Sequence, residues 1–471
     1  MVVGDVTTGT DVLIVGGGPG GYVAAIRGAQ LGLDVTLVEK DAYGGTCLNH
    51  GCIPSKAFVS ATDLAHRAGH AERMGIYADP AIDMQGLVTW KDRVVRRLTK
   101  GVETLCENAG VNLLAGRAEF ASHDTARVIH DDDGQGAETV EFEHAILATG
   151  SRPVELDGFA FDGENILSSR DALALSSVPE RLAVVGAGYI GMELATVFRK
   201  LGCEVTVIEQ LAAALPGYED DVTRVVRERA EDLGVEFRFG HAAEGYEETG
   251  DGLRVRTATD DGETATVEAE KCLVAVGRRP VTDTVAIENL GIETTEAGFV
   301  ATDEQARTSL EHVFAVGDVA GEPMLAHTAF REGEVAAEVI AGEPAALDYQ
   351  AMPAAVFTDP EIATVGMTEA EAAEAGFDPV VGEMPLRASG RALTRDEREG
   401  FVRVVADGTD GFVLGGQIVG PEASELVAEL GLAIEMGATL EDVAATVHVH
   451  PTLSEAVHEA AMGAAGRSIH Y

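Results

Sequence analysis

Hydrophobic residues alternate along the chain between short continuous runs and longer segments with helical spacing. From Asp11, the stretch "DVLIVGGGPGGYVAAIRGAQLGLDVTLVEK" gives an apolar run at Val12–Val15, a glycine turn, a helical segment and a second apolar run. The same order returns at Arg181 in "RLAVVGAGYIGMELATVFRKLGCEVTVIEQ". Buried strands that alternate with helices of this length are typical of parallel sheets. The pattern therefore predicts an α/β protein that contains two βαβ units.

Each βαβ unit carries a G-x-G-x-x-G turn and an acidic residue at the end of its second strand. The first glycine permits a tight turn, the second lets the backbone approach a pyrophosphate, and the third lets the helix pack on the strand. The acid can accept a hydrogen bond from a ribose hydroxyl. The candidate residues are Gly16, Gly18, Gly21 and Glu39 in the first unit, and Gly186, Gly188, Gly191 and Glu209 in the second. We therefore expect two Rossmann-like dinucleotide-binding domains.

Simpler interpretations are a glycine turn without a ligand and, for Glu209, a solvated strand end. The flanking strand, helix and terminal acid together favour nucleotide binding. The carboxylate of Glu209 would also repel the 2′-phosphate of NADP, whereas it can accept a bond from the free 2′-hydroxyl of NAD. The second unit is therefore expected to bind NAD.

Further strand ends supply more candidate cofactor-binding residues. The segments "AILATGSRPVELDG" and "CLVAVGRRPVTD" end the two units in a similar way, and "HVFAVGDVAGEPMLAHTA" contains a buried strand that ends at Gly317-Asp318. An acid at such a strand end can bind a ribityl or ribose hydroxyl, although a plain turn is the alternative. The candidates from these segments are Thr149, Gly150, Gly277, Asp318 and Ala326.

The last part of the chain changes character from about Tyr349. Strand-like segments, "AVFTDPEIATVG", "FVRVVAD" and "VLGGQIVG", are followed by the helical "ASELVAELGLAIEMG". This order indicates a separate α+β domain. The expected boundaries are 1–150 and 151–277 for the two nucleotide-binding domains, 278–347 for a return to the first, and 348–471 for the α+β domain.

The net charge of −45, from 79 acidic and 34 basic residues, excludes several classes of partner. Such a field repels nucleic acid and anionic membranes, so neither is expected to bind. Only six of the basic residues are lysines, and this Lys-poor, carboxylate-rich composition suits a cytosol rich in salt, which screens the self-repulsion. The start "MVVGDVTTGT" lacks the features of a signal peptide, and no apolar run approaches the ~18 residues of a membrane span. A cytoplasmic location is therefore expected.

Two cysteines lie close together in "GGTCLNHGCIPSK", Gly44–Lys56. On a regular helix, Cys47 and Cys52 would be offset by about 7.5 Å along the axis and would face nearly opposite directions. Their Cα atoms would then be roughly 8–9 Å apart, beyond the limit of about 7 Å for a disulfide. A disulfide here therefore requires an interrupted helix, which Gly51 and Pro54 favour.

Three interpretations of the cysteine pair remain. A structural disulfide is disfavoured in the cytosol. A metal site could use Cys47, His50 and Cys52, but no companion pair of ligands follows, so no metal is expected. A redox-active pair beside a flavin is favoured over both. Three other cysteines are isolated and are expected to be small buried residues: Cys106, Cys203 and Cys272.

The cysteine segment resembles the active-site signature of the flavin disulfide reductases. The final stretch "HVHPTLSEAVHEA", His448–Ala460, resembles the C-terminal signature of the same family, and the order of motifs matches over nearly the whole chain. The resemblance implies that residues 1–150 bind FAD, that residues 151–277 bind NAD, and that the C-terminal domain forms a homodimer.

The resemblance also implies roles for the residues of the first signature. Cys47 would exchange with the substrate disulfide, and Cys52 would face the flavin as a thiolate. Lys56 would lie near the flavin and pair with Glu193, although a solvated lysine is the alternative. His50 replaces an aliphatic residue of the family pattern, and a charged imidazole there would lower the pKa of a thiol.

In the second signature, the resemblance implies that His450 reaches the site from the partner subunit and acts as the base. Glu455 would orient its imidazole, as in other triads. The alternative for Glu455 is a capping box in "TLSE". His448 and His458 are expected to pack or face solvent.

Comparison within the family narrows the expected reaction. Glu209 disfavours the NADPH-linked glutathione-type reductases, and the lack of a cysteine after Cys272 disfavours mercuric reductases. The closest resemblance is to members that oxidise protein-bound dihydrolipoamide with NAD+, which implies a lipoyl-bearing partner such as a 2-oxoacid dehydrogenase complex or a glycine cleavage H protein. The alternatives are a reductase of another disulfide, an NADH oxidase or diaphorase, and a flavoprotein that serves as a structural subunit.

Overall fold

The computed structural model describes residues 6–130 and 136–471. The first nucleotide-binding unit forms a seven-stranded sheet in the order β3-β2-β1-β6-β5-β4, and β17 pairs with β6. Its strands are β1 (Val6–Val15), β2 (Val35–Glu39), β3 (Asn112–Ala115), β4 (Arg117–Ser122), β5 (Thr125–Ile129), β6 (Ala137–Leu147) and β17 (Val313–Ala315). Strands β3, β2, β1, β6 and β17 are parallel, whereas β4 and β5 add an antiparallel edge.

Strand β1 is longer than the predicted run Val12–Val15, because it begins at Val6. The additional polar residues pair with β6, from Val6 opposite Glu138 to Thr10 opposite Phe142. This extension carries no continuous apolar run, so the sequence pattern did not indicate it.

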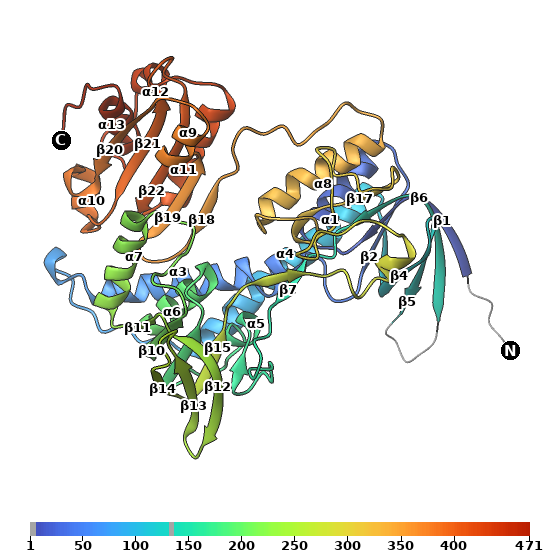
Figure 1. Ribbon diagram of the computed structural model, residues 1–471, viewed down its shortest axis with the longest axis horizontal. Coiled ribbons are helices and arrows are strands. Elements are labelled where there is room, and N and C mark those ends of the chain that lie inside the picture. Colours follow the sequence, from blue (N-terminus) through green and yellow to red (C-terminus); the bar gives the residue numbers. More distant parts are fainter. Residues whose placement is uncertain (1–5, 131–135) are drawn as a thin grey trace.

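Helices α1 (Pro19–Gln30) and α8 (Ala326–Ile340) lie side by side on this sheet (Figure 1). Their contact depends on glycine, because a Cβ atom on Gly333 would approach the carbonyl oxygen of Gly20 to 2.5 Å. Residues far apart in the sequence thus form one nucleotide-binding unit.

The second unit is a five-stranded parallel sheet in the order β11-β10-β9-β15-β8. Its strands are β8 (Ile166–Leu167), β9 (Arg181–Val185), β10 (Glu204–Glu209), β11 (Glu236–Phe239) and β15 (Lys271–Val274), with helices α5 (Ser169–Ala172), α6 (Tyr189–Lys200) and α7 (Asp220–Leu233). An antiparallel sheet of β12 (Ala242–Thr249), β13 (Gly252–Ala258) and β14 (Thr264–Ala269) extends from it. The ribbon of β7 (Ser151–Pro153) and β16 (Arg278–Pro280) connects the two units.

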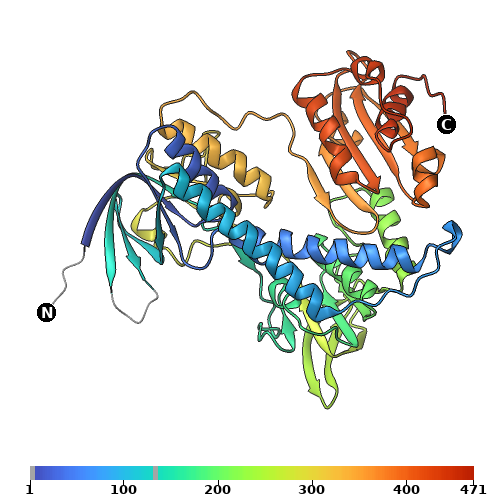
Figure 2. The ribbon, with the colours of Figure 1, turned by 180° about the vertical axis from the view of Figure 1, so that it is seen from behind.

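Helices α2 (Gly45–Asn49), α3 (Cys52–Gly69) and α4 (Met84–Ala109) follow the first βαβ unit. Figure 2 shows α3 and α4 as long blue helices that extend from the first sheet across the middle of the molecule, with the C-terminal part above them and the second unit below. Helix α3 packs against α6 of the second unit. The two nucleotide-binding units are therefore joined by helices as well as by the ribbon.

The C-terminal part is an antiparallel sheet in the order β18-β19-β22-β21-β20, covered by helices (Figure 1). Its strands are β18 (Ala354–Val356), β19 (Glu361–Gly366), β20 (Pro379–Pro385), β21 (Phe401–Asp407) and β22 (Val413–Gly420), and its helices are α9 (Glu369–Glu374), α10 (Gly390–Arg395), α11 (Ala423–Glu435), α12 (Leu440–Ala445) and α13 (Glu455–Ala464). The expected α/β class with two Rossmann-like units and a C-terminal α+β domain is confirmed.

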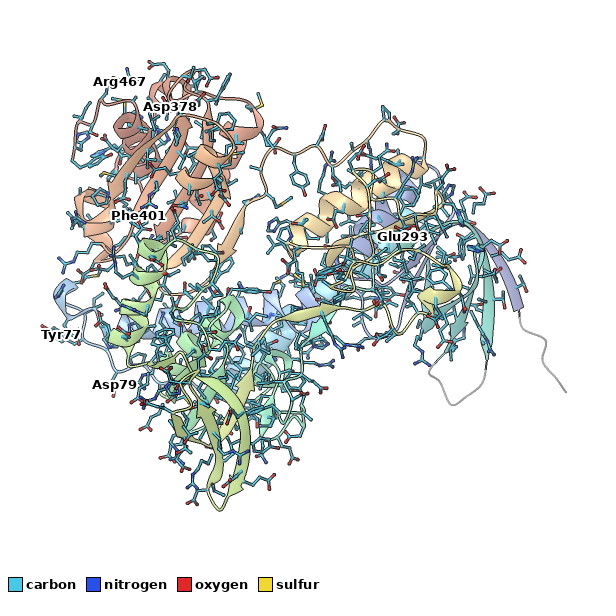
Figure 3. The ribbon with its side chains drawn as sticks, viewed as in Figure 1. Tyr77, Asp79, Glu293, Asp378, Phe401 and Arg467 are labelled. Atoms are coloured by element: carbon cyan, nitrogen blue, oxygen red, sulfur yellow. The ribbon has the colours of Figure 1, made fainter. Side chains whose placement is uncertain are left out.

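Two details of the C-terminal sheet differ from the sequence pattern. The segment "AVFTDPEIATVG" forms two strands, because the chain turns at Thr358–Pro360. Strand β20 was not predicted, since prolines at both ends of "PVVGEMP" argue against a strand. Figure 3 labels Phe401 where this sheet meets α7. None of the described helices combines the length and the apolar character that a membrane span requires.

Candidate active site

A pocket of about 400 Å³ lies where the first sheet meets α1, α2 and α3. It brings together residues from five separate segments of the sequence. The predicted site residues that line it are Gly16, Gly18, Glu39, Cys47, Cys52, Lys56, Thr149, Gly150, Glu193, Asp318 and Ala326. The cysteine segment and the first nucleotide motif therefore share one cavity.

The glycine turn of the first unit fits a ligand phosphate by geometry. Gly16 has a φ of 108°, and a Cβ atom there would approach the carbonyl oxygen of Ala148 to 2.3 Å. A Cβ atom on Gly21 would approach the carbonyl oxygen of Gly16 to 1.8 Å, so α1 packs closely on β1. Helix α1 begins after Gly18 without a side-chain cap. Its first amides therefore remain available for an anion at the pocket.

Glu39 lines the same pocket and is held by the backbone on both sides. Its two carboxylate oxygens accept hydrogen bonds from the amides of Gly17, at 2.6 Å, and Asp41, at 2.8 Å. An ionised carboxylate has about four acceptor positions, so each oxygen can still accept a bond from a ribose hydroxyl.

The second unit repeats this arrangement. Glu209 is buried and accepts hydrogen bonds from the amides of Ala187, at 2.7 Å, and Leu211, at 2.8 Å. A Cβ atom on Gly191 would approach the carbonyl oxygen of Gly186 to 2.0 Å, whereas one on Gly188 would meet no atom within 4 Å. The space above Gly188 and the absence of a side-chain cap on α6 suit a second pyrophosphate.

Gly277 precedes the ribbon that joins the two units. It has a φ of 121°, which favours glycine, and its carbonyl oxygen accepts a hydrogen bond from the amide of Val154 at 3.0 Å. The strand end just before it lies against the second glycine turn, because a Cβ atom on Gly186 would approach the carbonyl oxygen of Ala275 to 2.5 Å.

The two cysteines lie on different helices, as the disulfide geometry requires. Cys47 is in α2 and Cys52 is the first residue of α3, and the helices are separated by His50 and Gly51. Gly51 has φ −128° and ψ −106°, which interrupts the helical path. Both cysteines are free thiols in the structure.

The two thiols differ in their ionisation. A hydrogen bond to Cys52 raises the pKa of Cys47 above its usual range, and burial adds to this effect. The same hydrogen bond lowers the pKa of Cys52 to about 7, and the Lys56 ammonium lowers it further while burial opposes the change. Cys47 therefore keeps its proton and donates a hydrogen bond to the Cys52 thiolate. Cys52 is accessible from the pocket although protein atoms surround it closely.

Lys56 and Glu193, which were expected to pair, are in contact beside Cys52. The Lys56 Nζ atom lies 2.8 Å from Oε2 and 3.1 Å from Oε1 of Glu193. Phe357 also contacts both residues: its amide donates to Glu193 Oε1 at 2.9 Å, and its ring centroid lies 4.2 Å from Lys56 Nζ. No sequence pattern identified Phe357, because it comes from the C-terminal part of the chain.

Asp318 lines the pocket and accepts a hydrogen bond from the Ser151 hydroxyl. The Arg278 guanidinium donates to Ser151 Oγ at 2.7 Å and to its carbonyl oxygen at 2.8 Å. The sequence did not single out Ser151 and Arg278 as site residues. Both lie in the repeated strand ends "ATGSRP" and "VGRRP", and this repeat was the pattern that could have identified them. The plain-turn interpretation of Asp318 is incomplete, since these residues fix its carboxylate at the pocket wall.

Glu332 on α8 was also missed by the sequence. Its carboxylate accepts a hydrogen bond from the amide of Gly317, next to Asp318. Burial raises the pKa of Glu332 to about 7, and the charge of Asp318 adds to this rise. Helical periodicity alone does not show which turn a helix carboxylate contacts, so no signal was available.

The structure corrects the expectation for His50. Its Nε2 atom lies 3.4 Å from Asp41 Oδ2, so the ring turns to this carboxylate. Burial and the nearby Arg170 charge lower the pKa of His50, which makes it neutral at pH 7. His50 therefore does not act as a cation on either thiol. In the part of the chain that the structure describes, no three His, Cys, Asp or Glu side chains are grouped to hold a metal ion. Cys106, Cys203 and Cys272 are buried, as expected.

His450 and Glu455 are in contact with each other but lie outside the pocket. His450 Nδ1 is 2.8 Å from Glu455 Oε1, and the His450 side chain is 81% exposed. The capping-box alternative is met in part: α13 begins at Glu455 without a side-chain cap, and the Thr452 hydroxyl bonds the Val449 carbonyl instead, but Glu455 does bind the Thr452 amide. The other oxygen of Glu455 accepts from the amide of Thr452 at 2.8 Å. His448 is bound to Glu429 at 2.6 Å.

Comparisons with known proteins agree with this geometry. Residues 10–333 match the family described as pyridine nucleotide-disulphide oxidoreductase, and residues 352–461 match its dimerisation domain. The chain is 69% identical to "Dihydrolipoyl dehydrogenase 2" of Haloarcula marismortui, with 100% of both chains covered. It is 65% identical to a dihydrolipoyl dehydrogenase of Halobacterium salinarum, with 100% of this chain and 99% of the relative covered.

Solved structures show the same architecture. LpdA from Mycobacterium tuberculosis is 29% identical, with a TM-score of 0.89 over 96% of this chain and 99% of that one. The flavoprotein disulfide reductase RclA from Escherichia coli is 25% identical, with a TM-score of 0.86 over 96% of this chain and 99% of that one. From these similarities in sequence and in fold, this chain belongs to the pyridine nucleotide-disulphide oxidoreductase family.

Proposed function

We propose that this chain is a dihydrolipoyl dehydrogenase, which oxidises protein-bound dihydrolipoamide to lipoamide and reduces NAD+ to NADH. The observation that carries the proposal is the cysteine pair in the pocket, where Cys47 holds a proton and the pKa of Cys52 is lowered to about 7. Full-length relatives at 60–69% identity have this name.

We propose FAD for the pocket of the first unit and NAD for the second. The tight glycine turns and the uncapped helices α1 and α6 support a pyrophosphate in each unit. Glu39 and Glu209 would bind the ribose hydroxyls, while Asp318, with Thr149, Gly150 and Ala326, would line the site of the flavin and its ribityl chain. When bound there, FAD would supply two-electron transfer between the Cys47–Cys52 dithiol and NAD+.

The cysteine pair exchanges with the substrate as a disulfide. A thiolate of dihydrolipoamide attacks Sγ of Cys47, the Cys47–Cys52 bond breaks, and Cys52 leaves as a thiolate. The second substrate thiolate then attacks the mixed disulfide, which releases oxidised lipoamide and Cys47, and Cys47 takes up a proton. Because a thiol of low pKa is a good leaving group, the lowered pKa of Cys52 favours the first step.

Lys56 and Glu193 hold charge beside Cys52. The Lys56 ammonium stabilises the Cys52 thiolate, because an opposite charge favours the ionised form. Glu193 neutralises part of that charge and fixes the position of the ammonium. The pair thus sets how readily Cys52 releases its electron pair.

His450 acts as the base that removes protons from the substrate thiols, and Glu455 orients its ring and stabilises its charged form. Since His450 is exposed and outside the pocket of its own chain, we propose that it serves the pocket of a second copy. The dimerisation domain at residues 352–461 supports a homodimer of this kind.

We further propose a lipoyl-bearing protein as the partner, either a 2-oxoacid dehydrogenase complex or a glycine cleavage H protein, and a cytoplasmic location. A lipoyl group on a long side chain suits a pocket that a partner subunit completes. The net charge of −45 supports the exclusion of nucleic acid and of anionic membranes as partners.

The test is NADH formation from NAD+ and dihydrolipoamide by FAD-loaded protein in concentrated KCl. Turnover that is lost in Cys47→Ser and His450→Ala supports the proposal. Turnover of NADPH with oxidised glutathione would instead favour a different disulfide substrate. Flavin-loaded protein that assembles with its complex but does not turn over dihydrolipoamide would indicate a structural subunit.

A further inference from the structure

Helices α3 and α6 are joined by two ion pairs of opposite polarity. Lys56 on α3 pairs with Glu193 on α6, and Asp63 on α3 pairs with Lys200 on α6 at 2.6 Å. Each pair spans 137 residues of sequence. Along each helix the paired residues are seven apart, which is about two turns and places them on one face. The two helices therefore run in the same direction with a fixed register.

A short segment of the C-terminal part contacts both ion pairs. This segment follows β18, and it presents Phe357 to the pair Lys56–Glu193 and Asp359 to Lys200. The Asp359 carboxylate lies 2.8 Å from Lys200 Nζ and 3.2 Å from Arg229 Nη2. The Lys200 side chain is only 2% exposed and that of Asp359 is 28% exposed, so this ion pair is buried at its Lys200 end.

The ion pairs of Asp359 with Lys200 and Arg229 fix the place of Phe357. Asp359 is two residues from Phe357, and Thr358 between them is buried, with its hydroxyl bonded to the Pro360 carbonyl at 2.8 Å. The charges of Lys200 and Arg229 lower the pKa of Asp359 although burial opposes them, which keeps this carboxylate ionised. The segment is therefore anchored by charge at one end and delivers an aromatic ring at the other.

We propose that Phe357 is a positioning residue for the redox pair, whose ring and amide hold the Lys56–Glu193 ion pair in place beside Cys52. This inference rests on the proposed function, because it assigns the ion pair a role in the thiol chemistry. It implies that the position of the C-terminal domain affects the redox site of the same chain.

The physical reason lies in the balance of charges around Cys52. The groups that face this thiol are Cys47, Lys56, Glu193 and Tyr189. The Lys56 ammonium lowers the pKa of Cys52, and the Glu193 carboxylate raises it. The pKa of Cys52 therefore depends on how close the ammonium lies to the thiol and how close to the carboxylate. The face of an aromatic ring attracts a cation. Without the Phe357 ring, Glu193 alone holds the ammonium and cancels more of its effect on Cys52.

The experiment measures the Cys52 thiolate directly in a Cys47→Ser background. Serine keeps a hydrogen-bond donor at position 47, and the three other cysteines are buried. A thiolate next to an oxidised flavin produces a long-wavelength charge-transfer absorbance, which is titrated with pH in the FAD-loaded protein. The variants are Phe357→Leu and Phe357→Met, which keep the backbone amide and remove the ring, and Phe357→Tyr, which keeps the ring.

Phe401→Leu is the matched control. The Arg403 guanidinium lies 4.7 Å from the Phe401 ring, and Arg403 also bonds Glu219 at the start of α7, so this variant loosens another cation–π contact at the same domain boundary. It does not touch the Lys56–Glu193 pair. A general loosening of the C-terminal domain would therefore affect both sites, whereas a local effect requires Phe357.

Removal of the Phe357 ring is expected to raise the titration midpoint by about half to one pH unit, which is a roughly three- to ten-fold fall in the ratio of thiolate to thiol at a given pH. Phe357→Tyr and Phe401→Leu should titrate like the parent. The inference is overturned if Phe357→Leu and Phe357→Met titrate like the parent, or if Phe401→Leu shifts the midpoint equally. Absence of dihydrolipoamide turnover in the wild-type protein, with the shift still present, would contradict the proposed function alone.

Discussion

His450 Nδ1 lies 2.8 Å from Oε1 of Glu455, while the ring itself is 81% exposed on the C-terminal domain. The hydrogen bond fixes the tautomer, because a carboxylate only accepts, so Nδ1 carries the proton and Nε2 is free as a base. Burial raises the pKa of Glu455, but the Thr452 amide and His450 outweigh it, and the net pKa is lowered. This orientation suits the proposed role of His450 as the base for the pocket of a second copy.

His450→Ala should reduce kcat with dihydrolipoamide by about 10²–10⁴-fold, the usual contribution of a general base. Glu455→Gln should cause a smaller loss, because Gln can still accept from Nδ1 but cannot stabilise the imidazolium. Initial rates of NADH formation between pH 6 and 9 provide the measurement. His458→Gln is the control: His458 lies on α13 with Glu455, and this variant should leave the rate unchanged. Equal rates in His450→Ala and wild type would remove His450 from the reaction.

The pH dependence of Cys52 gives a second test. A thiol is ionised above its pKa, and the pKa of Cys52 is lowered from its ordinary value near 9 to about 7. The charge-transfer absorbance of the two-electron-reduced protein should therefore rise with pH, with a midpoint near 7. His50→Gln should not move this midpoint, because His50 is neutral there and turned to Asp41. A midpoint near 9 would contradict the assigned ionisation.

Substitution of Glu39 or Glu209, which hold equivalent positions in the two units, should affect the binding of one cofactor and not of the other. Glu209→Gln should raise the KM for NAD+ by about ten-fold or more, because a hydrogen bond to a charged group contributes about 1.5–3 kcal/mol. It should also improve the use of NADP+, since the repelling charge is gone. Flavin retention should not change. Glu39→Gln is the matched variant and should weaken flavin retention instead, as followed by absorbance after gel filtration. An interchange of these effects would reverse the cofactor assignment.

Arg403 should stabilise the contact between the C-terminal sheet and α7. Its guanidinium bonds Glu219, Asp221 and Glu383 and is 13% exposed. Arg403→Met would leave three carboxylates without a counter-charge. Because these carboxylates are about a third exposed, we expect a loss of about 1–3 kcal/mol in the free energy of unfolding, below the value for a fully buried pair. Urea titration at constant KCl measures it. Arg254→Met, at the exposed pair with Glu268, should change the stability very little.

Salt should stabilise the folded protein. With a net charge of −45, the carboxylates repel one another, and the Debye length falls from about 10 Å at 0.1 M to about 3 Å at 1 M salt. The melting temperature should therefore rise steeply with KCl. Sucrose at equal osmolarity is the control and should give a smaller rise, because it does not screen charge. An equal rise in both would attribute the effect to exclusion of solute rather than to screening. Relatives of this chain come from halophilic archaea.

Local patterns were sufficient for much of the fold. The glycine turns predicted the start of α1 and α6, because only glycine allows the close approach of turn and helix. The glycines and proline of "GGTCLNHGCIPSK" predicted the break between α2 and α3 for the same kind of local reason. Strand β20 and the first half of β1 were missed, since their pairing depends on distant partners rather than on an apolar run. The domain boundaries stay a prediction.

By itself, the sequence determined two nucleotide-binding units, a cysteine pair on an interrupted helix and a histidine–glutamate pair near the C-terminus. The first two features depend on residues that are close in the sequence, so their spacing is enough, whereas the third came from the resemblance of His448–Ala460 to the C-terminal signature of the family. Only the tertiary structure decided where His50 turns and that Phe357 and Asp359 reach two ion pairs between α3 and α6, and it supplied the physical cause of the lowered pKa of Cys52, whose thiolate the resemblance had implied. The contacts of Phe357 and Asp359 join residues more than a hundred positions apart, and they reach both ion pairs because helix packing sets the register of α3 against α6.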